Sequence, residues 1–180
     1  LYHAAPVVIL SPFRFLARPE SWLWAIHRHR ATLSASPNFG YELCLRKVQD
    51  ADIEGLDLSS WRMAVNGAEP VSPSTIRRFA DRFGPNGFRP EAMSPVYGLA
   101  ESSVGLTFPP LGRGPLIDRV ERGELTARSE AVVAPPEQGG ALEFVACGRP
   151  LPGHQVRVVD RSGRELPDRH QGRLQFSGPS

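Results

Sequence analysis

Short apolar runs alternate with helical patterns over the first hundred residues, and this alternation constrains the fold more than any other feature. Strands are predicted at the mostly apolar runs 7–10, 61–65 and 92–96 and at a short segment near residues 32–34. Helical spacing of apolar residues fills the intervals between them. Because consecutive strands separated by helices are joined by right-handed crossovers, the order predicts an α/β fold, a mostly parallel sheet with flanking helices.

Two Ser-Pro pairs mark where the longer helices are expected to begin. A serine hydroxyl can cap a helix, and proline is favoured at the first helical position. Ser36-Pro37 therefore predicts a helix over 37–48, and Ser72-Pro73 predicts another that Gly84-Pro85 ends.

The chain changes character near residue 109. Glycine, proline and arginine dominate residues 109–141, and short strand patterns separated by turn residues follow up to residue 176. These patterns predict three parts: an α/β nucleotide-binding subdomain over 1–108, an insertion-like loop region with a connecting strand over 109–147, and the truncated start of an antiparallel β subdomain over 148–180.

Composition excludes several classes of protein. The formal net charge of +2 gives no argument for nucleic-acid binding, and no run approaches the roughly 18 apolar residues of a transmembrane segment. Cys44 and Cys147 lie apart in apolar contexts and are expected to be isolated buried thiols, which fits a cytoplasmic location. The sequence contains no phosphate loop, no nucleophile elbow and no dinucleotide fingerprint, so a nicotinamide oxidoreductase is not expected.

Two glycine-containing junctions are the best candidates for a binding site. Residues 66–70 and 97–101 each follow a predicted strand. Ligands of parallel α/β sheets bind at the carboxyl ends of the strands. Both junctions are therefore expected to line the site.

Four motifs resemble those of the adenylate-forming (AMP-binding) superfamily. Residues 97–101 (Tyr-Gly-Leu-Ala-Glu) resemble its Tyr-Gly-x-x-Glu signature, and residues 66–70 (Asn-Gly-Ala-Glu-Pro) resemble its adenine-binding turn. Gly148-Arg149-Pro150 and Gly172-Arg173-Leu174 resemble two later motifs. Further segments resemble the branch of fatty acyl-AMP ligases and long-chain acyl-CoA synthetases, namely 15–19, 36–39, 58–62 and 87–91. The long stretch between Glu101 and Gly148 resembles the insertion of fatty acyl-AMP ligases.

The resemblance implies an activity and its cofactors. Enzymes of this branch join a fatty acid to AMP from ATP, release pyrophosphate and pass the acyl group to a thiol. ATP/AMP and Mg²⁺ are therefore the expected ligands. The acceptor would be CoA or the phosphopantetheine of an acyl carrier protein, and a polyketide or nonribosomal synthase module is a further expected partner. The motifs leave open which acceptor is used.

The same resemblance assigns roles to residues. Glu101 matches the catalytic carboxylate that holds Mg²⁺. The residues that match nucleotide-binding positions are Asn66, Gly67, Ala68, Glu69, Pro70, Tyr97, Gly98, Leu99 and Ala100. Tyr97 would pack against adenine, and Gly98 would allow close backbone approach to the nucleotide.

The chain departs from many relatives at two positions. Pro95 stands where Asn is common, and Ala100 stands where Thr is common. Both departures resemble the fatty acyl-AMP ligase branch. Phe39 and Gly40 lie on the helix that resembles the border of the acyl channel; ordinary core packing explains them equally well.

The chain resembles an internal fragment of the large N-terminal domain. The family's phosphate-binding loop, ribose-binding aspartate and catalytic lysine are expected to lie outside it. The isolated chain is therefore expected to be inactive. The alternative is a non-catalytic adenylate-binding or interaction module with the same fold.

Overall fold

The computed structural model describes residues 4–180, which fall into two compact units. The first unit holds the chain up to Ser94 together with Leu111–Gly114. The second unit holds Pro95–Pro110 and Pro115–Ser180. Each unit is described by itself.

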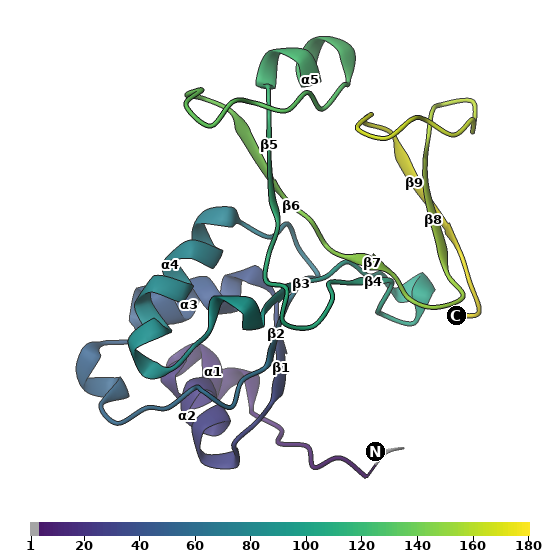
Figure 1. The fold of residues 1–180 in the computed structure, drawn as a ribbon. Helices are drawn as coiled ribbons and strands as arrows, with labels where there is room; N and C mark the ends of the chain where they lie inside the picture. The colour runs from purple at the N-terminus through teal and green to yellow at the C-terminus, as the bar shows by residue number, and fades with distance from the viewer. Residues whose placement is uncertain (1–3) are drawn as a thin grey trace. The chain divides into compact units, whose positions relative to one another are not determined.

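The first unit is an α/β arrangement with a parallel pair of strands at its centre. Its sheet has the order β1-β2-β3, and β1 pairs with β2 in parallel from Leu33↔Met63 to Ser36↔Asn66. The elements, shown in Figure 1, are α1 (Pro12–Ala17), α2 (Glu20–His29), β1 (Leu33–Ser36), α3 (Asn38–Lys47), β2 (Met63–Asn66), α4 (Pro73–Phe83) and β3 (Met93–Pro95). Short 3₁₀ helices occupy Asp50–Ile53, Gly84–Asn86 and Pro90–Ala92. The predicted α/β class is confirmed.

Aromatic side chains fill the core of this unit. Trp61 lies at its centre, with Trp22 at 5.2 Å and Phe88 at 5.4 Å between ring centroids, both edge-on. Tyr41 and Phe79 are fully buried beside it and pack edge-on at 5.0 Å. Edge-to-face pairs of this kind contribute about 1 kcal/mol each beyond the area they bury. The buried residues of α2, α3 and α4 therefore converge on one core.

Cys44 is a buried member of this core. Burial, and secondarily the charge of Glu20, raises the pKa of the Cys44 thiol to about 12. The thiol therefore stays protonated and acts as a small apolar side chain, as expected from the sequence. Cys147 is only partly buried, and burial raises the pKa of its thiol as well.

Two predictions in the first unit are wrong. Residues 7–10 form no strand; Val7 and Ile9 are 65% and 89% exposed, and the segment pairs with no strand of the described chain. Ser36 does not cap α3: Pro37 is the cap residue, and the Ser36 hydroxyl donates to the carbonyl of Pro37 at 3.0 Å. By contrast, the hydroxyl of Ser72 accepts the Thr75 amide at 3.4 Å and caps α4 as predicted.

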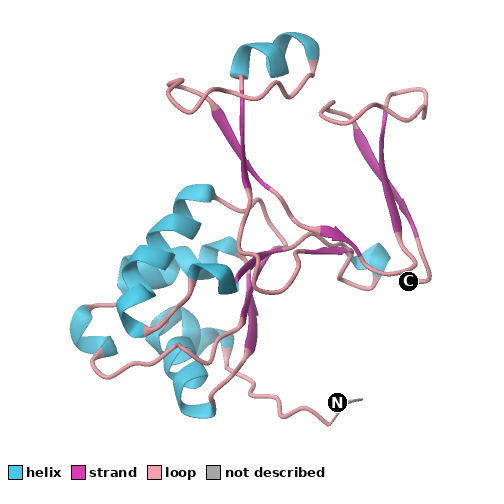
Figure 2. Cartoon of the chain, viewed as in Figure 1, coloured by secondary structure: helices cyan, strands magenta, loops and turns pink. Residues whose placement is uncertain are grey.

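The second unit consists of two-stranded antiparallel sheets. Figure 2 shows its strands as separate pairs, β4 with β7, β5 with β6 and β8 with β9. The elements are β4 (Thr107–Phe108), β5 (Ile117–Val120), α5 (Arg122–Arg128), β6 (Leu142–Val145), β7 (Arg149–Pro150), β8 (Gln155–Val159) and β9 (Arg173–Ser177), with a 3₁₀ helix at Ala100–Ser102. The antiparallel strands predicted after residue 148 are confirmed, whereas β5 and α5 were not predicted. Among the helices of residues 4–180, none has the length and apolar character to cross a bilayer.

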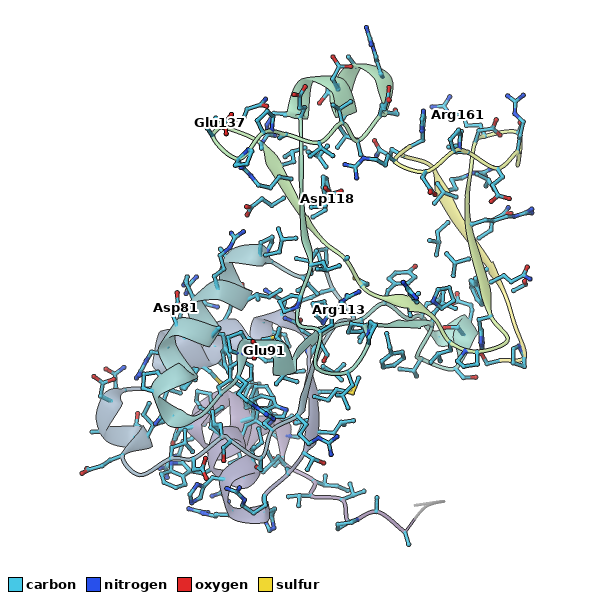
Figure 3. The ribbon with its side chains drawn as sticks, in the orientation of Figure 1. Asp81, Glu91, Arg113, Asp118, Glu137 and Arg161 are labelled. Carbon is cyan, nitrogen blue, oxygen red and sulfur yellow. The ribbon has the colours of Figure 1, made fainter. Side chains whose placement is uncertain are left out.

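Arg169, near the tip of the β8–β9 hairpin, ties that hairpin to the segment around α5. Its guanidinium lies 3.1 Å from a carboxylate oxygen of Asp118, which projects from β5 (Figure 3). It also donates to the Ala131 carbonyl at 2.5 Å, and the Ala131 amide donates back to the Arg169 carbonyl at 2.7 Å. The insertion-like region is thus attached to the β8–β9 hairpin within the second unit.

The acid stability of the first unit is expected to depend on Asp57. Hydrogen bonds from Ser59, then the Arg30 guanidinium at 2.5 Å, lower the pKa of the Asp57 carboxyl to about 2. A carboxyl whose pKa is lower in the folded state stabilises the protein above its unfolded pKa of about 3.9. That contribution is lost as pH falls from about 4 to 2. Asp57→Asn should therefore reduce the fall in thermal midpoint over this range, and an unchanged fall would contradict the assignment.

Candidate functional site

The first candidate segment, residues 66–70, is the turn that leaves β2. Asn66 is fully buried and Gly67 is buried, whereas Ala68, Glu69 and Pro70 are exposed. Ala68 has a φ of 64°, in the left-handed region that costs a residue with a Cβ about 1 kcal/mol. Backbone strain of this kind is concentrated at functional sites. The strained turn at Ala68 was not visible from the sequence.

Contacts from α3 hold this turn. A carboxylate oxygen of Glu69 accepts the Phe39 amide at 2.5 Å, and the Asn66 side chain donates to that of Asn38 at 3.4 Å. The structure therefore brings two predicted site residues, Phe39 and Glu69, into direct contact. Asn38 is a member of this site that sequence reasoning did not single out.

Phe39 and Gly40, the acyl-channel candidates, differ in exposure. Phe39 is 46% exposed and Gly40 is buried. A Cβ on Gly40 would lie 2.0 Å from the Ser36 hydroxyl and 3.4 Å from the Phe15 ring. The glycine therefore lets α3 pack closely against these residues, and a role beside an acyl chain stays a prediction.

The second candidate segment, residues 97–101, begins at a backbone bridge. The Tyr97 amide donates to the Thr107 carbonyl at 3.2 Å, and the Thr107 amide donates back at 2.9 Å. This pairing fixes the backbone of Tyr97 while leaving the residue 40% exposed. An aromatic ring held this way can offer its face to a flat ligand.

Gly98 is enclosed by backbone. A Cβ at this position would lie 1.7 Å from the Val104 carbonyl oxygen and 2.8 Å from its carbonyl carbon. Real Cβ atoms do not approach backbone so closely, so only glycine fits. Its predicted role beside a nucleotide stays a prediction; the structure shows that the path of the protein's own chain requires a glycine here.

Glu101 is an exposed residue of the 3₁₀ helix Ala100–Ser102. Within the described residues its carboxylate has no hydrogen-bond or ion-pair partner, and residues 4–180 contain no cluster of three or more acidic, histidine or cysteine side chains. Mg²⁺ usually takes one or two carboxylates and completes its shell with substrate phosphates and water. A single free carboxylate fits that requirement.

The two candidate segments belong to different units. A cavity of about 430 Å³ in the first unit is lined by other residues: Arg62, Arg89, Glu91, Ala92, Leu111 and Gly112. Another of about 650 Å³ lies against the β8–β9 hairpin in the second unit. No predicted site residue lines either cavity.

Comparison with known families identifies the chain. The model of the family described as AMP-binding enzyme matches residues 1–180. This chain belongs to the AMP-binding enzyme family. The family assignment inferred from residues 66–70 and 97–101 is confirmed.

Relatives within the AMP-binding family act on fatty and aryl-alkanoic acids. A medium-chain-fatty-acid–[acyl-carrier-protein] ligase of Moorena producens is 40% identical over 161 residues, which are 89% of this chain and 27% of that protein. A 4-hydroxyphenylalkanoate adenylyltransferase of Mycobacterium tuberculosis is 38% identical over 157 residues, 87% of this chain and 25% of that protein.

A solved structure agrees. The fatty acyl-adenylate ligase from L. pneumophila, in complex with acyl adenylate and pyrophosphate, superposes with a TM-score of 0.85 and 36% identity over 91% of this chain and 28% of that one. The chain thus resembles the fatty acyl-AMP ligase branch and spans less than a third of the length of these relatives.

Proposed function

We propose that the full-length protein is a ligase that activates a fatty acid as acyl-AMP, using ATP and Mg²⁺ and releasing pyrophosphate. The similarity to the L. pneumophila ligase, whose structure contains acyl adenylate and pyrophosphate, carries this proposal. Residues 66–70 and 97–101 are its nucleotide-binding segments, with the Tyr97 ring against adenine and Glu101 toward the metal.

The residues of segment 97–101 have roles that follow from their chemistry. The bridge to Thr107 orients Tyr97, and the enclosed Gly98 fixes the path of the chain toward Glu101. Mg²⁺, when bound, offsets the repulsion between the carboxylate of the fatty acid and the phosphates of ATP. The Glu101 carboxylate would hold it there together with the phosphate oxygens. The side chains of Pro95 and Ala100 have no hydrogen-bonding group. Other groups would therefore contact the adenine amino group and the phosphate.

The acceptor is proposed to be a carrier-protein thiol. The relative from Moorena producens is named for an acyl-carrier-protein acceptor, and the insertion-like region of this chain contains β5, α5 and β6. CoA is the competing acceptor. Comparing acyl transfer to holo acyl carrier protein with transfer to CoA in the full-length protein decides between them.

Pyrophosphate release with fatty acids of graded length tests the central proposal. We expect release that depends on both ATP and fatty acid, with acyl-AMP accumulating when no thiol is present. Binding of an acyl-adenylate analogue without any turnover would instead support the non-catalytic module. The inactivity expected of the isolated chain stays a prediction, and the same assay on that chain tests it.

A further inference from the structure

Helix α3 begins without a cap of its own. Its cap residue, Pro37, has no side-chain acceptor, and the neighbouring Ser36 hydroxyl donates to the Pro37 carbonyl. The amide groups of a first helical turn have no partner within the helix and need acceptors from elsewhere. Here the Phe39 amide donates to the carboxylate of Glu69, 30 residues along the chain, at 2.5 Å. A negative charge is also favourable at this end of a helix dipole.

Asn38 makes a second connection at the same turn. Its side-chain oxygen accepts the Ser72 amide at 3.1 Å and the Asn66 side-chain amide at 3.4 Å. Its nitrogen donates to the Thr75 hydroxyl at 3.3 Å. Because a backbone amide can only donate, the Ser72 contact fixes which way the Asn38 amide points.

The network continues consistently beyond Asn38. The Thr75 hydroxyl uses its own proton on the Glu42 carboxylate at 2.6 Å, which leaves its lone pairs for Asn38. Arg78 pairs with the same carboxylate at 3.1 Å. Since Asn66 and Thr75 are almost completely buried, breaking this network would leave polar groups unsatisfied inside the protein.

A third connection joins α3 to β2 at the residue before Asn66. The buried Tyr41 hydroxyl donates to the Val65 carbonyl at 2.8 Å. Residues 38, 39 and 41 of α3 thus bind residues 66, 69 and 65 respectively. The end of β2, the strained turn and the start of α3 are joined at three points within the first unit.

We propose that Glu69 and Asn38 are positioning residues that make the 66–70 turn and the first turn of α3 move as one body. The effect of this positioning on catalysis rests on the proposed function. On this proposal Glu69, which the sequence predicted as a nucleotide-binding residue, acts instead through Phe39. Because Phe39 is half-exposed on the helix proposed to border the acyl channel, nucleotide binding at residues 66–70 would alter fatty-acid affinity, and the reverse effect would be equal.

Replacing Glu69 in two ways separates acceptor from charge. Glu69→Gln keeps an oxygen that can accept the Phe39 amide, whereas Glu69→Ala removes it. In the full-length protein we expect hydrogen exchange of the Phe39 amide to accelerate about tenfold or more in Glu69→Ala. In Glu69→Gln, which loses only the charge at the helix end, we expect about threefold.

Kinetics provide the second measurement. Glu69→Ala should raise KM for both ATP and fatty acid with a smaller change in kcat, and Glu69→Gln should restore most of the loss. If Gln were as damaging as Ala, the carboxylate charge itself would be required, and the positioning role would be overturned.

Asn38→Ala tests the other connection. We expect faster exchange at the Ser72 amide, which donates to Asn38, and Glu69→Ala should leave the Ser72 amide unchanged. Unchanged exchange at Phe39 in Glu69→Ala and at Ser72 in Asn38→Ala would overturn the inference even in an active enzyme. Absence of acyl-AMP formation by the wild-type protein would refute the proposed function while the exchange rates still decide the positioning role.

Discussion

Glu101→Ala in the full-length protein is expected to lower kcat/KM for acyl-AMP formation by about 100-fold to 1,000-fold, the usual loss when one electrostatic contact to the transition state is removed. The Glu101 carboxylate is exposed and has no protein partner among the described residues, so the protein's own folding does not require it. Thermal stability should therefore stay close to wild type. Pyrophosphate release with a saturating fatty acid provides the measurement.

Glutamine should restore little activity at position 101, in contrast to its effect at position 69. Glu101→Gln should be nearly as inactive as Glu101→Ala, because a neutral amide oxygen is a poor ligand for Mg²⁺. Raised Mg²⁺ should recover part of the lost rate. Glu91 provides a matched control, since it is also an exposed glutamate in a short 3₁₀ helix. An active Glu101→Ala variant, or equal losses in Glu91→Ala, would remove Glu101 from the site.

Gly98→Ala is expected to destabilise the full-length protein by about 3 kcal/mol and to abolish most acyl-AMP formation. The new methyl group would meet the Val104 carbonyl oxygen at 1.7 Å, and backbone cannot rotate away as a side chain can. Val104 is already strained, with a φ of 81° that a β-branched residue rarely adopts. The loop is therefore expected to rebuild, which would displace Tyr97 and Glu101 together.

Gly139→Ala is the control for this substitution. A Cβ at Gly139 would meet no atom within 4 Å, and the residue has no positive φ. Its thermal midpoint and its rate of pyrophosphate release should match those of the wild-type protein. A Gly98→Ala variant with a wild-type midpoint would show that the close approach to Val104 is absent in solution.

Local signals in the sequence predicted the structure where a local contact decides it. Ser72 caps α4 because the acceptor for the Thr75 amide lies three residues away. The same Ser-Pro signal at Ser36 was misleading, because the acceptor for α3 is Glu69, 30 residues away. A local pattern contains no information about such a contact. Residues 7–10 failed similarly, since strand composition does not provide a pairing partner.

The second unit shows the same limit in its strands. β5 pairs with β6 across the whole insertion-like region, from Ile117↔Val145 to Val120↔Leu142, and neither the pairing nor α5 was predicted. The motif at residues 97–101 was found because its spacing is specific. Its physical basis, the bridge to Thr107 and the enclosure of Gly98 by Val104, depends on residues outside the motif.

The β5–β6 ladder has an evolutionary consequence. Its antiparallel pairing places residue 117 beside residue 145, and the Ala146 amide donates to the Leu116 carbonyl at 2.9 Å. The segment between them therefore begins and ends at neighbouring points of the chain. A tight turn could close the same gap, and lengthening such a loop costs little conformational entropy. A shorter or longer segment could accordingly be accommodated without rebuilding the strands that flank it, although its loss would remove the Arg169 contacts with Asp118 and Ala131.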